Sequence, residues 1–260
     1  MEEALGSGQL QPGGTIFEGT AGSTGVSLAM VSAALGCKAH VVLPDDAAIE
    51  KAQLLSAYGA TVERVRPVSI SHRDHFVNIA RRKAEETDGG FFSNQFENLA
   101  NFRAHLKTGE EIYIQTGGRL DAFVCAAGTG GTIAGISKYL KSKIKDLQVF
   151  LIDPPGSSLF NRVKRGVLYT SVEAEGKRLK NPFDTITEGI GINRLTKNFI
   201  QGEALIDDAL QGTDYEAVEM ARQLIKEDGL FIGSSSAMNC VGAVKVAQKL
   251  GPGHTIVCHF

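Results

Sequence analysis

The sequence has neither a marked excess of charge nor a long apolar run. Its 260 residues carry 27 basic and 29 acidic side chains, which gives a formal net charge of −2. This balance provides no electrostatic attraction to nucleic acid or to an anionic membrane surface, so we expect neither as a partner. No run of eighteen apolar residues and no signal-peptide pattern occurs, so we expect neither a membrane span nor secretion.

Cysteine is scarce, and its spacing is typical of neither a disulfide framework nor a metal site. Cys37, Cys125, Cys240 and Cys258 are scattered and form no C-x-x-C pair, and the six histidines show no ligand spacing. We therefore expect buried free thiols in a reducing compartment such as the cytoplasm, and no metal. A disulfide or a zinc site is the less favoured alternative.

Proline is also scarce, with 7 residues, whereas glycine is abundant, with 30. Glycine without collagen periodicity is typical of many tight turns between strands and helices. The content of 43% hydrophobic and 22% charged residues is that of a globular protein, and the length suits one large or two medium domains.

Strand and helix patterns alternate along the chain. Strands are expected at 15–17, 39–43, 61–65, 120–127, 148–152, 230–232 and 254–258. Helices are expected at 26–36, 44–58, 71–87, 104–116, 132–143, 215–227 and 234–250. This alternation predicts an α/β fold of open parallel sheets with helices on both faces. A break at Asn98-Leu-Ala-Asn101 predicts two domains, 1–98 and 99–260.

The most informative stretch is Gly128-Thr-Gly-Gly-Thr-Ile-Ala-Gly135, which follows a predicted strand and opens a predicted helix. The free N–H groups and the dipole of a helix N-terminus favour a phosphate there. Two more Gly/Ser/Thr loops, 19–25 and 233–236, lie at similar junctions, and such loops converge at one edge of an open parallel sheet. One loop alone is equally well explained as turn chemistry, but three together favour a ligand site.

Two nucleotide-binding motifs compete with this interpretation. A dinucleotide fingerprint requires G-x-G-x-x-G after a strand and an acidic residue about twenty positions later, and the glycine spacing here differs. A P-loop requires Lys-Ser or Lys-Thr after the glycines, and neither follows Gly131. Both nucleotide motifs are therefore disfavoured.

Taken together, the motifs resemble those of the fold type II pyridoxal-phosphate enzymes, specifically the cysteine synthase and cystathionine β-synthase family. They occur in the family's order over essentially the whole chain: Thr20-Ala-Gly-Ser-Thr-Gly25, Asn94-Gln-Phe-Glu-Asn98, Gly128-Thr-Gly-Gly-Thr132, Glu188-Gly-Ile-Gly191 and Gly233-Ser-Ser-Ser236. The resemblance implies two open parallel-sheet βα domains, tryptophan synthase β-like, with pyridoxal 5'-phosphate as cofactor. Residues 1–98 would form the smaller substrate-loop domain and 99–260 the larger domain that binds the cofactor's phosphate.

The resemblance also implies a role for each loop. It assigns contact with the cofactor to Ser23, Gly128, Thr129, Gly130, Gly131, Thr132 and Ser235. It assigns binding of the amino-acid substrate to Thr20, Ala21, Gly22, Thr24, Gln95 and Gly189. A neutral Ser235 hydroxyl facing the pyridine nitrogen would leave that nitrogen unprotonated, which suits β-elimination and β-replacement better than transamination.

Two departures from the family pattern stand out. Ser23 occupies the place of an asparagine that contacts the cofactor's ring hydroxyl. Its own hydroxyl would reach the ring directly or through water, or Ser23 marks altered substrate choice, or it is a plain turn residue. In addition, the family's Schiff-base lysine lies in an upstream Ser-x-Lys-x-Arg motif that this chain lacks, so no catalytic residue is assigned.

We therefore expect a chain truncated at both ends, with an incomplete N-terminal domain. The favoured function of the family member is β-replacement on O-acetylserine or serine with sulfide or a thiol, in cysteine biosynthesis. The alternatives are a non-catalytic relative that binds cofactor or amino acid, and a lyase of the serine/threonine dehydratase type. The full-length protein is expected to be a homodimer in the cytoplasm, or in mitochondria if a targeting segment precedes this chain.

Overall fold

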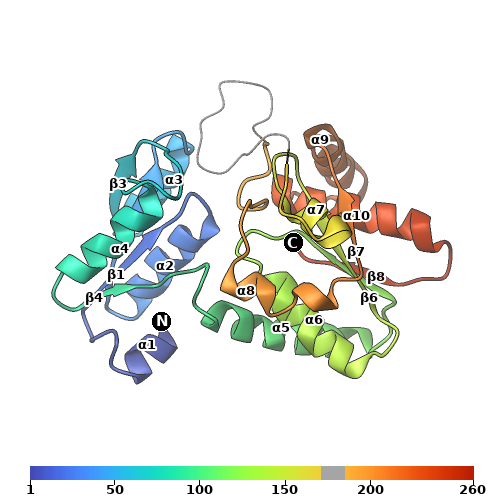
Figure 1. Cartoon of the computed structure of the whole chain (residues 1–260), viewed down its shortest axis with the longest axis horizontal. Coiled ribbons are helices and arrows are strands. Elements are labelled where there is room, and N and C mark those ends of the chain that lie inside the picture. Colours follow the sequence, from blue (N-terminus) through green and yellow to red (C-terminus); the bar gives the residue numbers. More distant parts are fainter. Residues whose placement is uncertain (171–184) are drawn as a thin grey trace. The chain divides into compact units, whose positions relative to one another are not determined.

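The structure, a computed structural model, describes residues 1–170 and 185–260, which divide into two compact units (Figure 1). The first unit comprises Met1–Gln95, and the second comprises the described residues from Phe96 to Phe260. Each unit has its own four-stranded sheet in which every pair of neighbouring strands is parallel. The predicted α/β class with two parallel sheets is therefore confirmed.

The first unit has the strand order β3-β2-β1-β4. Its strands are β1 (Thr15–Gly19), β2 (Lys38–Pro44), β3 (Thr61–Val65) and β4 (Gly90–Phe92). Its helices are α1 (Glu2–Gly6), α2 (Ser23–Ala34), α3 (Ile49–Ala57) and α4 (Phe76–Glu86).

Alternation along β2 determines which helices cover this sheet. Ala39, Val41 and Leu43 share one face and form a buried cluster with residues of α2 and α3. Helix α4 packs against β1, β2 and β4. It approaches the end of β1 closely, since a Cβ added at Gly19 would lie 2.5 Å from the Cα of Val77. Glycine at this position brings the end of β1, and the loop that follows it, against a helix.

The second unit has the strand order β7-β6-β5-β8. Its strands are β5 (Ala122–Cys125), β6 (Gln148–Asp153), β7 (Asp208–Gln211) and β8 (Ile256–Cys258). Its α-helices are α5 (Ala100–Thr116), α6 (Gly131–Lys143), α7 (Leu159–Arg165), α8 (Lys197–Ile200), α9 (Asp214–Gln223) and α10 (Ser234–Leu250). A 3₁₀ turn, η1 (Glu203–Leu205), precedes β7, and a π-helical turn, η2 (Leu224–Asp228), extends α9.

The central strands of this sheet are buried on both faces, as expected for a parallel sheet. Phe123 and Leu151 point to one face and pack in a cluster that includes Ile136 of α6. Val124 and Phe150 point to the other face and pack in a cluster that includes Met238 of α10. Figure 1 shows α10 on one side of β6 and β8, with α5 and α6 on the other. The near-continuous apolar runs of β5 and β6 follow from this double coverage.

Some element predictions were wrong. Residues 230–232 form no strand. They lie in the loop that leads from η2 to α10, where Phe231 is 88% exposed. Strands β4 and β7 were missed because they are only 3 and 4 residues long, too short to show an alternating pattern. The helix predicted from residue 71 begins at Phe76, with the buried His75 side chain accepting a hydrogen bond from the N–H of Val77.

The predicted thiols are confirmed: all four cysteines are free, three of them buried and Cys258 half-buried. Among the helices of the described residues, none is both long enough and apolar enough to cross a bilayer.

Helix α9 begins with a reciprocal pair of capping hydrogen bonds whose contribution to stability can be measured. The Thr213 side chain accepts from the N–H of Glu216, and the Glu216 carboxylate accepts from the N–H of Thr213, which is a capping box. We expect Thr213→Ala to lower the free energy of unfolding by about 1 kcal/mol. Urea unfolding would measure this, with exposed Ser27→Ala as the control. Equal effects of the two substitutions would contradict the capping role.

Candidate functional site

The Gly/Thr loop of the second unit connects β5 to α6 and leaves a helix N-terminus available for an anion. Gly130 is the N-cap of α6, has φ +82°, and provides no side-chain cap. Within the described residues, no acceptor bonds the N–H groups of Gly131 and Thr132. The first turn of a 13-residue helix therefore presents its positive dipole end and unpaired donors together.

Close packing behind this loop requires glycine. A Cβ added at Gly128 would lie 2.1 Å from the carbonyl oxygen of Gly189, and one added at Gly130 would lie 2.5 Å from the Cβ of Phe199. One added at Gly131 would lie 2.2 Å from Oδ1 of Asn101. At Gly128 and Gly130 the clash includes backbone atoms, so no side chain fits there, whereas at Gly131 the Asn101 side chain would have to move.

Side chains from α5 and from the segment before α8 hold the loop's threonines. Asn101 Nδ2 donates to Thr129 Oγ1 at 2.8 Å, and Thr196 Oγ1 donates to the Thr129 carbonyl at 2.6 Å. His105 Nε2 shares a hydrogen bond of 3.0 Å with Thr132 Oγ1. Burial, and secondarily His259, lower the pKa of His105, which favours a neutral imidazole beside the loop.

Gly189 and Ser235 lie near the same end of β5. The N–H of Gly191 donates to the Ala127 carbonyl at 2.8 Å, which aligns the segment around Gly189 with the loop. The N–H of Ala126 donates to Oδ1 of Asn239 at 2.7 Å, which ties α10 to β5. Ser235 lies four residues before Asn239 and hence on the same face of α10. The second unit thus gathers three predicted segments at the end of one strand.

The Thr20 loop of the first unit has a similar construction at the end of β1. The buried Thr20 donates its N–H to the Val42 carbonyl at 3.0 Å, and its Oγ1 accepts from the N–H of Gly22 at 3.1 Å. Gly22 is the N-cap of α2 and provides no side-chain cap. Lys51 Nζ donates to the Ala21 carbonyl at 2.9 Å. These contacts fix the backbone of the loop, and they leave Ser23 exposed and Thr24 half-buried at the helix start.

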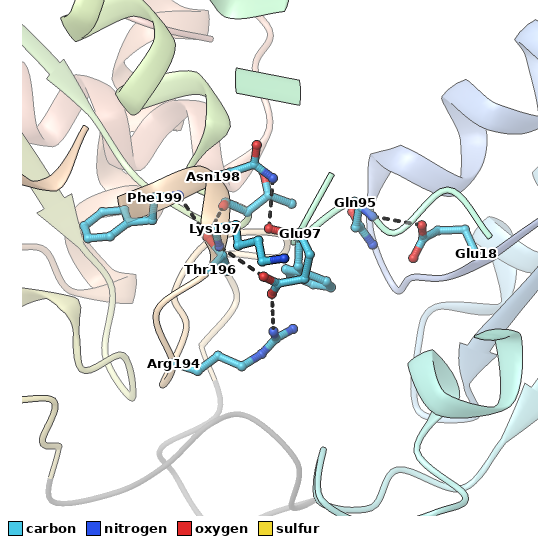
Figure 2. Close-up of polar contacts among 10 residues, drawn as sticks. Glu18, Gln95, Glu97, Arg194, Thr196, Lys197, Asn198 and Phe199 are labelled. Atoms are coloured by element: carbon cyan, nitrogen blue, oxygen red, sulfur yellow. Dashed lines mark hydrogen bonds and ion pairs between the residues drawn. The ribbon is translucent and has the colours of Figure 1, made fainter. Parts of the chain in front are cut away.

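Gln95 joins this loop through Glu18, as Figure 2 shows. The N–H of Gln95 donates to Glu18 Oε2 at 3.1 Å, and Gln95 Nε2 donates to the Gly19 carbonyl at 3.1 Å. Glu18 is 1% exposed, and burial raises its pKa to about 7 even though Ser93, Gln95 and Gly19 donate hydrogen bonds to it. The first unit therefore brings Gln95 and the Thr20–Thr24 loop together around one buried carboxyl.

Within the second unit, the start of α5 is held by a separate polar cluster, also drawn in Figure 2. The buried Asn198 donates from Nδ2 to the Phe96 carbonyl at 2.9 Å and accepts at Oδ1 from the N–H of Phe102. Arg194 Nη1 donates to Glu97 Oε1 at 3.3 Å. Thr196, whose hydroxyl donates to the Thr129 carbonyl, lies between Arg194 and Asn198 in the sequence.

The sequence analysis missed the residues that support both loops: Glu18, Asn101, His105, Thr196, Asn198 and Asn239. One of them carried a local signal, because the acidic Glu18 directly follows the apolar pair Ile16-Phe17 in a strand. The roles assigned to the loop residues themselves, in cofactor or substrate binding, stay predictions.

These features define an α/β protein of two parallel-sheet units, each with an open helix N-terminus at the end of a central strand. The chain belongs to the pyridoxal-phosphate dependent enzyme family, which it matches over residues 1–260. This membership confirms the predicted family and its cofactor, pyridoxal phosphate.

Within this family, the chain is similar to proteins named cysteine synthase. The chain is 55% identical to cysteine synthase 2 of Neurospora crassa, over 99% of this chain and 59% of the relative. It is 48% identical to the "Putative mitochondrial cysteine synthase" of Saccharomyces cerevisiae, over 94% of this chain and 64% of the relative. The chain spans about three fifths of the length of these relatives.

Among solved structures, the chain is similar to the O-acetylserine dependent cystathionine beta-synthase from Helicobacter pylori. The TM-score is 0.84 at 31% identity, over 100% of this chain and 78% of that structure. The predicted fold type II architecture is thereby confirmed. The uncapped N-terminus of α6, where no side chain fits at Gly128 or Gly130, suits the phosphate of the family's cofactor.

Proposed function

We propose that the protein containing this chain replaces the β-substituent of O-acetylserine or serine by sulfide or a thiol. One structural observation carries the proposal: the uncapped first turn of α6, whose flanking threonines are held by Asn101, Thr196 and His105. Relatives named cysteine synthase, and a structural neighbour described as O-acetylserine dependent, support this choice of reaction.

In this proposal the second unit binds the cofactor. The N–H groups of Gly131 and Thr132 and the hydroxyls of Thr129 and Thr132 hold the phosphate. Ser235 faces the ring nitrogen with a neutral hydroxyl. Pyridoxal phosphate, when bound, supplies the electron sink that acidifies the substrate's Cα–H and lets the β-substituent leave.

In the first unit, the α-carboxylate of the substrate is the anion for the N-terminus of α2. The N–H groups that follow Gly22 and the hydroxyl of Thr24 donate to it, and Gln95 adds a side-chain amide donor. By its resemblance to the family, Ser23 is assigned to cofactor binding and Gly189 to substrate binding, and both assignments are part of the proposal. The division of roles between 1–98 and 99–260 is part of the same proposal.

A second candidate is a relative that binds cofactor or amino acid without turnover. The observation that favours it is that no Ser-x-Lys-x-Arg motif occurs in the 260 residues. The chain's own groups then bind and orient both ligands, but none of them is assigned the proton transfer at Cα. A serine/threonine dehydratase-type lyase is the third candidate, because it requires the same two anion sites.

Equilibrium dialysis of residues 1–260 with pyridoxal phosphate, followed by product analysis with the full-length protein, separates these functions. We expect the chain of residues 1–260 to retain the cofactor without a lysine link, so that borohydride treatment and peptide mapping find no modified lysine. Cysteine formed from O-acetylserine and sulfide supports β-replacement, and pyruvate formed from serine without sulfide supports the lyase. Retention without either product supports the binding protein. If neither pyridoxal phosphate nor an amino acid is retained, all three candidates are contradicted.

The proposal extends to assembly and location. We propose a homodimer for the full-length protein, testable by light scattering. We propose a cytoplasmic location, with mitochondria as the alternative, since a relative's name includes "mitochondrial". Fractionation of the source cells would decide between the two compartments.

A further inference from the structure

We propose that Glu18 is a positioning residue for the site that binds the substrate's α-carboxylate. Its buried carboxyl holds Gln95 beside Gly19, where the Thr20–Thr24 loop begins. The inference rests on the proposed function, in which Gln95 and the N-terminus of α2 bind that carboxylate. Glu18 itself is the last side chain of β1 before Gly19 and does not need to touch the substrate to play this part.

The hydrogen bonds around Glu18 link two segments that are far apart in the sequence. Its Oε1 accepts from the N–H of Gly19 at 3.0 Å, on its own strand. Its Oε2 accepts from Ser93 Oγ and from the N–H of Gln95, at 3.1 Å for the latter. Gln95 Nε2 then donates to the Gly19 carbonyl at 3.1 Å, which closes a ring of contacts. One carboxyl thus fixes both the backbone and, through Gly19, the side-chain amide of Gln95.

The position of this ring relates it to the substrate loop. Gly19 leads directly into Thr20, whose N–H and hydroxyl are both bonded and which sets the start of α2. A shift of Gly19 would therefore move the loop and Gln95 together. On the other side, Asn94 precedes Gln95 with φ +53°, a conformation that non-glycine residues rarely adopt. Bonds from Ser93 and Gln95 to Glu18 flank this residue and hold its conformation in place.

The chemistry of Glu18 indicates a role other than stability. Ile16 and Phe17, the preceding residues of β1, are as buried as Glu18, and an apolar residue would cost less there than a carboxyl. Burial raises the pKa of Glu18 to about 7, which indicates that the fold tolerates an unfavourable group at this point. Buried groups with strongly shifted pKa values cluster at functional sites, and the hydrogen bonds of Glu18 place it beside the Thr20–Thr24 loop.

A double-mutant cycle on the full-length protein, loaded with pyridoxal phosphate, tests the proposal. The ligand is L-alanine, which has the α-carboxylate but no β-leaving group. We expect Glu18→Ala to raise its dissociation constant about tenfold, as for loss of a hydrogen bond to a charged group, with cofactor affinity changed less than about twofold. Gln95→Ala should have a similar effect, and the double variant should be no weaker than Gln95→Ala alone, because both changes remove one interaction.

Two further variants separate positioning from general destabilisation. Glu18→Gln keeps the shape of the side chain and is expected to fold and to lose affinity for L-alanine by a smaller factor. Glu63→Gln is the matched control, a carboxyl on β3 of the same unit that accepts from His40 and Lys83. An unchanged dissociation constant in Glu18→Ala, multiplicative effects in the double variant, or an equal loss in Glu63→Gln would overturn the proposal.

Hydrogen exchange tests the positioning role of Glu18 independently of the proposed function. In the parent protein, we expect the amide of Gln95 to be protected by Glu18, and peptides that span 93–95 to exchange at least about tenfold faster in Glu18→Ala. If the parent binds no L-alanine, the proposed function fails but the exchange result still stands. Unchanged exchange at 93–95 in the variant overturns the positioning role in either case.

Discussion

Replacing Gly130 by alanine is expected to weaken pyridoxal-phosphate binding by at least about 100-fold, equivalent to about 3 kcal/mol. Two effects combine at this position. Gly130 has φ +82°, which costs an alanine roughly 1 kcal/mol, and the new Cβ would lie 2.5 Å from the Cβ and 2.7 Å from the Cα of Phe199. Because one of these atoms is backbone, the loop itself must move, and with it the first N–H groups of α6.

Gly253→Ala is the matched control for this prediction. Gly253 has a similar φ of +88°, but a Cβ there would meet nothing within 4 Å. It shares the backbone strain of Gly130 without the contact at Phe199, so its cofactor affinity should stay within about twofold of the parent. Fluorescence titration with pyridoxal phosphate measures both variants. Full affinity in Gly130→Ala would show that the loop is not the phosphate site.

The parts of the fold that repeat a simple pattern could be predicted from the sequence. Residues 120–127 and 148–152 are apolar runs of strand length, and each is followed by loop residues, so β5 and β6 were predicted nearly in full. The loops at the ends of β1 and β5 were recognisable because glycine, serine and threonine are concentrated there. In both cases the signal lies within about ten neighbouring residues.

What could not be predicted depends on contacts between distant segments. Asn101 and Thr129 are 28 positions apart, and Glu18 and Gln95 are 77 apart, so nothing local indicates that these side chains meet. At residues 230–232, by contrast, a local signal was present but misleading. Leu-Phe-Ile is typical of a buried strand, but Phe231 is exposed in a loop, since a local pattern does not reveal whether a neighbouring strand is present.

Asp153 is expected to make the protein less stable as the pH rises from about 4 to about 7, by roughly 4 kcal/mol over that range. It ends β6 and is completely buried. The N–H of Phe160 donates to Oδ2 at 2.7 Å, whereas Oδ1 has no hydrogen-bond partner among the described residues. Burial raises the pKa of this carboxyl to about 7, from an ordinary value of 3.8.

The direction of the effect follows from this raised pKa. The folded protein keeps the proton that the unfolded chain has already released, so the stabilisation is complete below pH 3.8 and is lost as the pH rises through about 7. Glu18, whose pKa is also raised to about 7, acts in the same direction. Lowered pKa values at His105 and His259 act in the opposite direction, since they favour folding once these groups are neutral.

Asp153→Asn isolates the contribution of one carboxyl from these others. The amide cannot ionise, and its oxygen can accept from the N–H of Phe160 as Oδ2 does. We expect the difference in the free energy of unfolding, variant minus parent, to grow by about 3 kcal/mol between pH 5 and pH 8, measured with urea at both pH values. Glu18, His105 and His259 are present in both proteins and cancel in the difference. A difference between variant and parent that is the same at both pH values would mean that Asp153 is already ionised in the fold, with its charge balanced by hydrogen bonds.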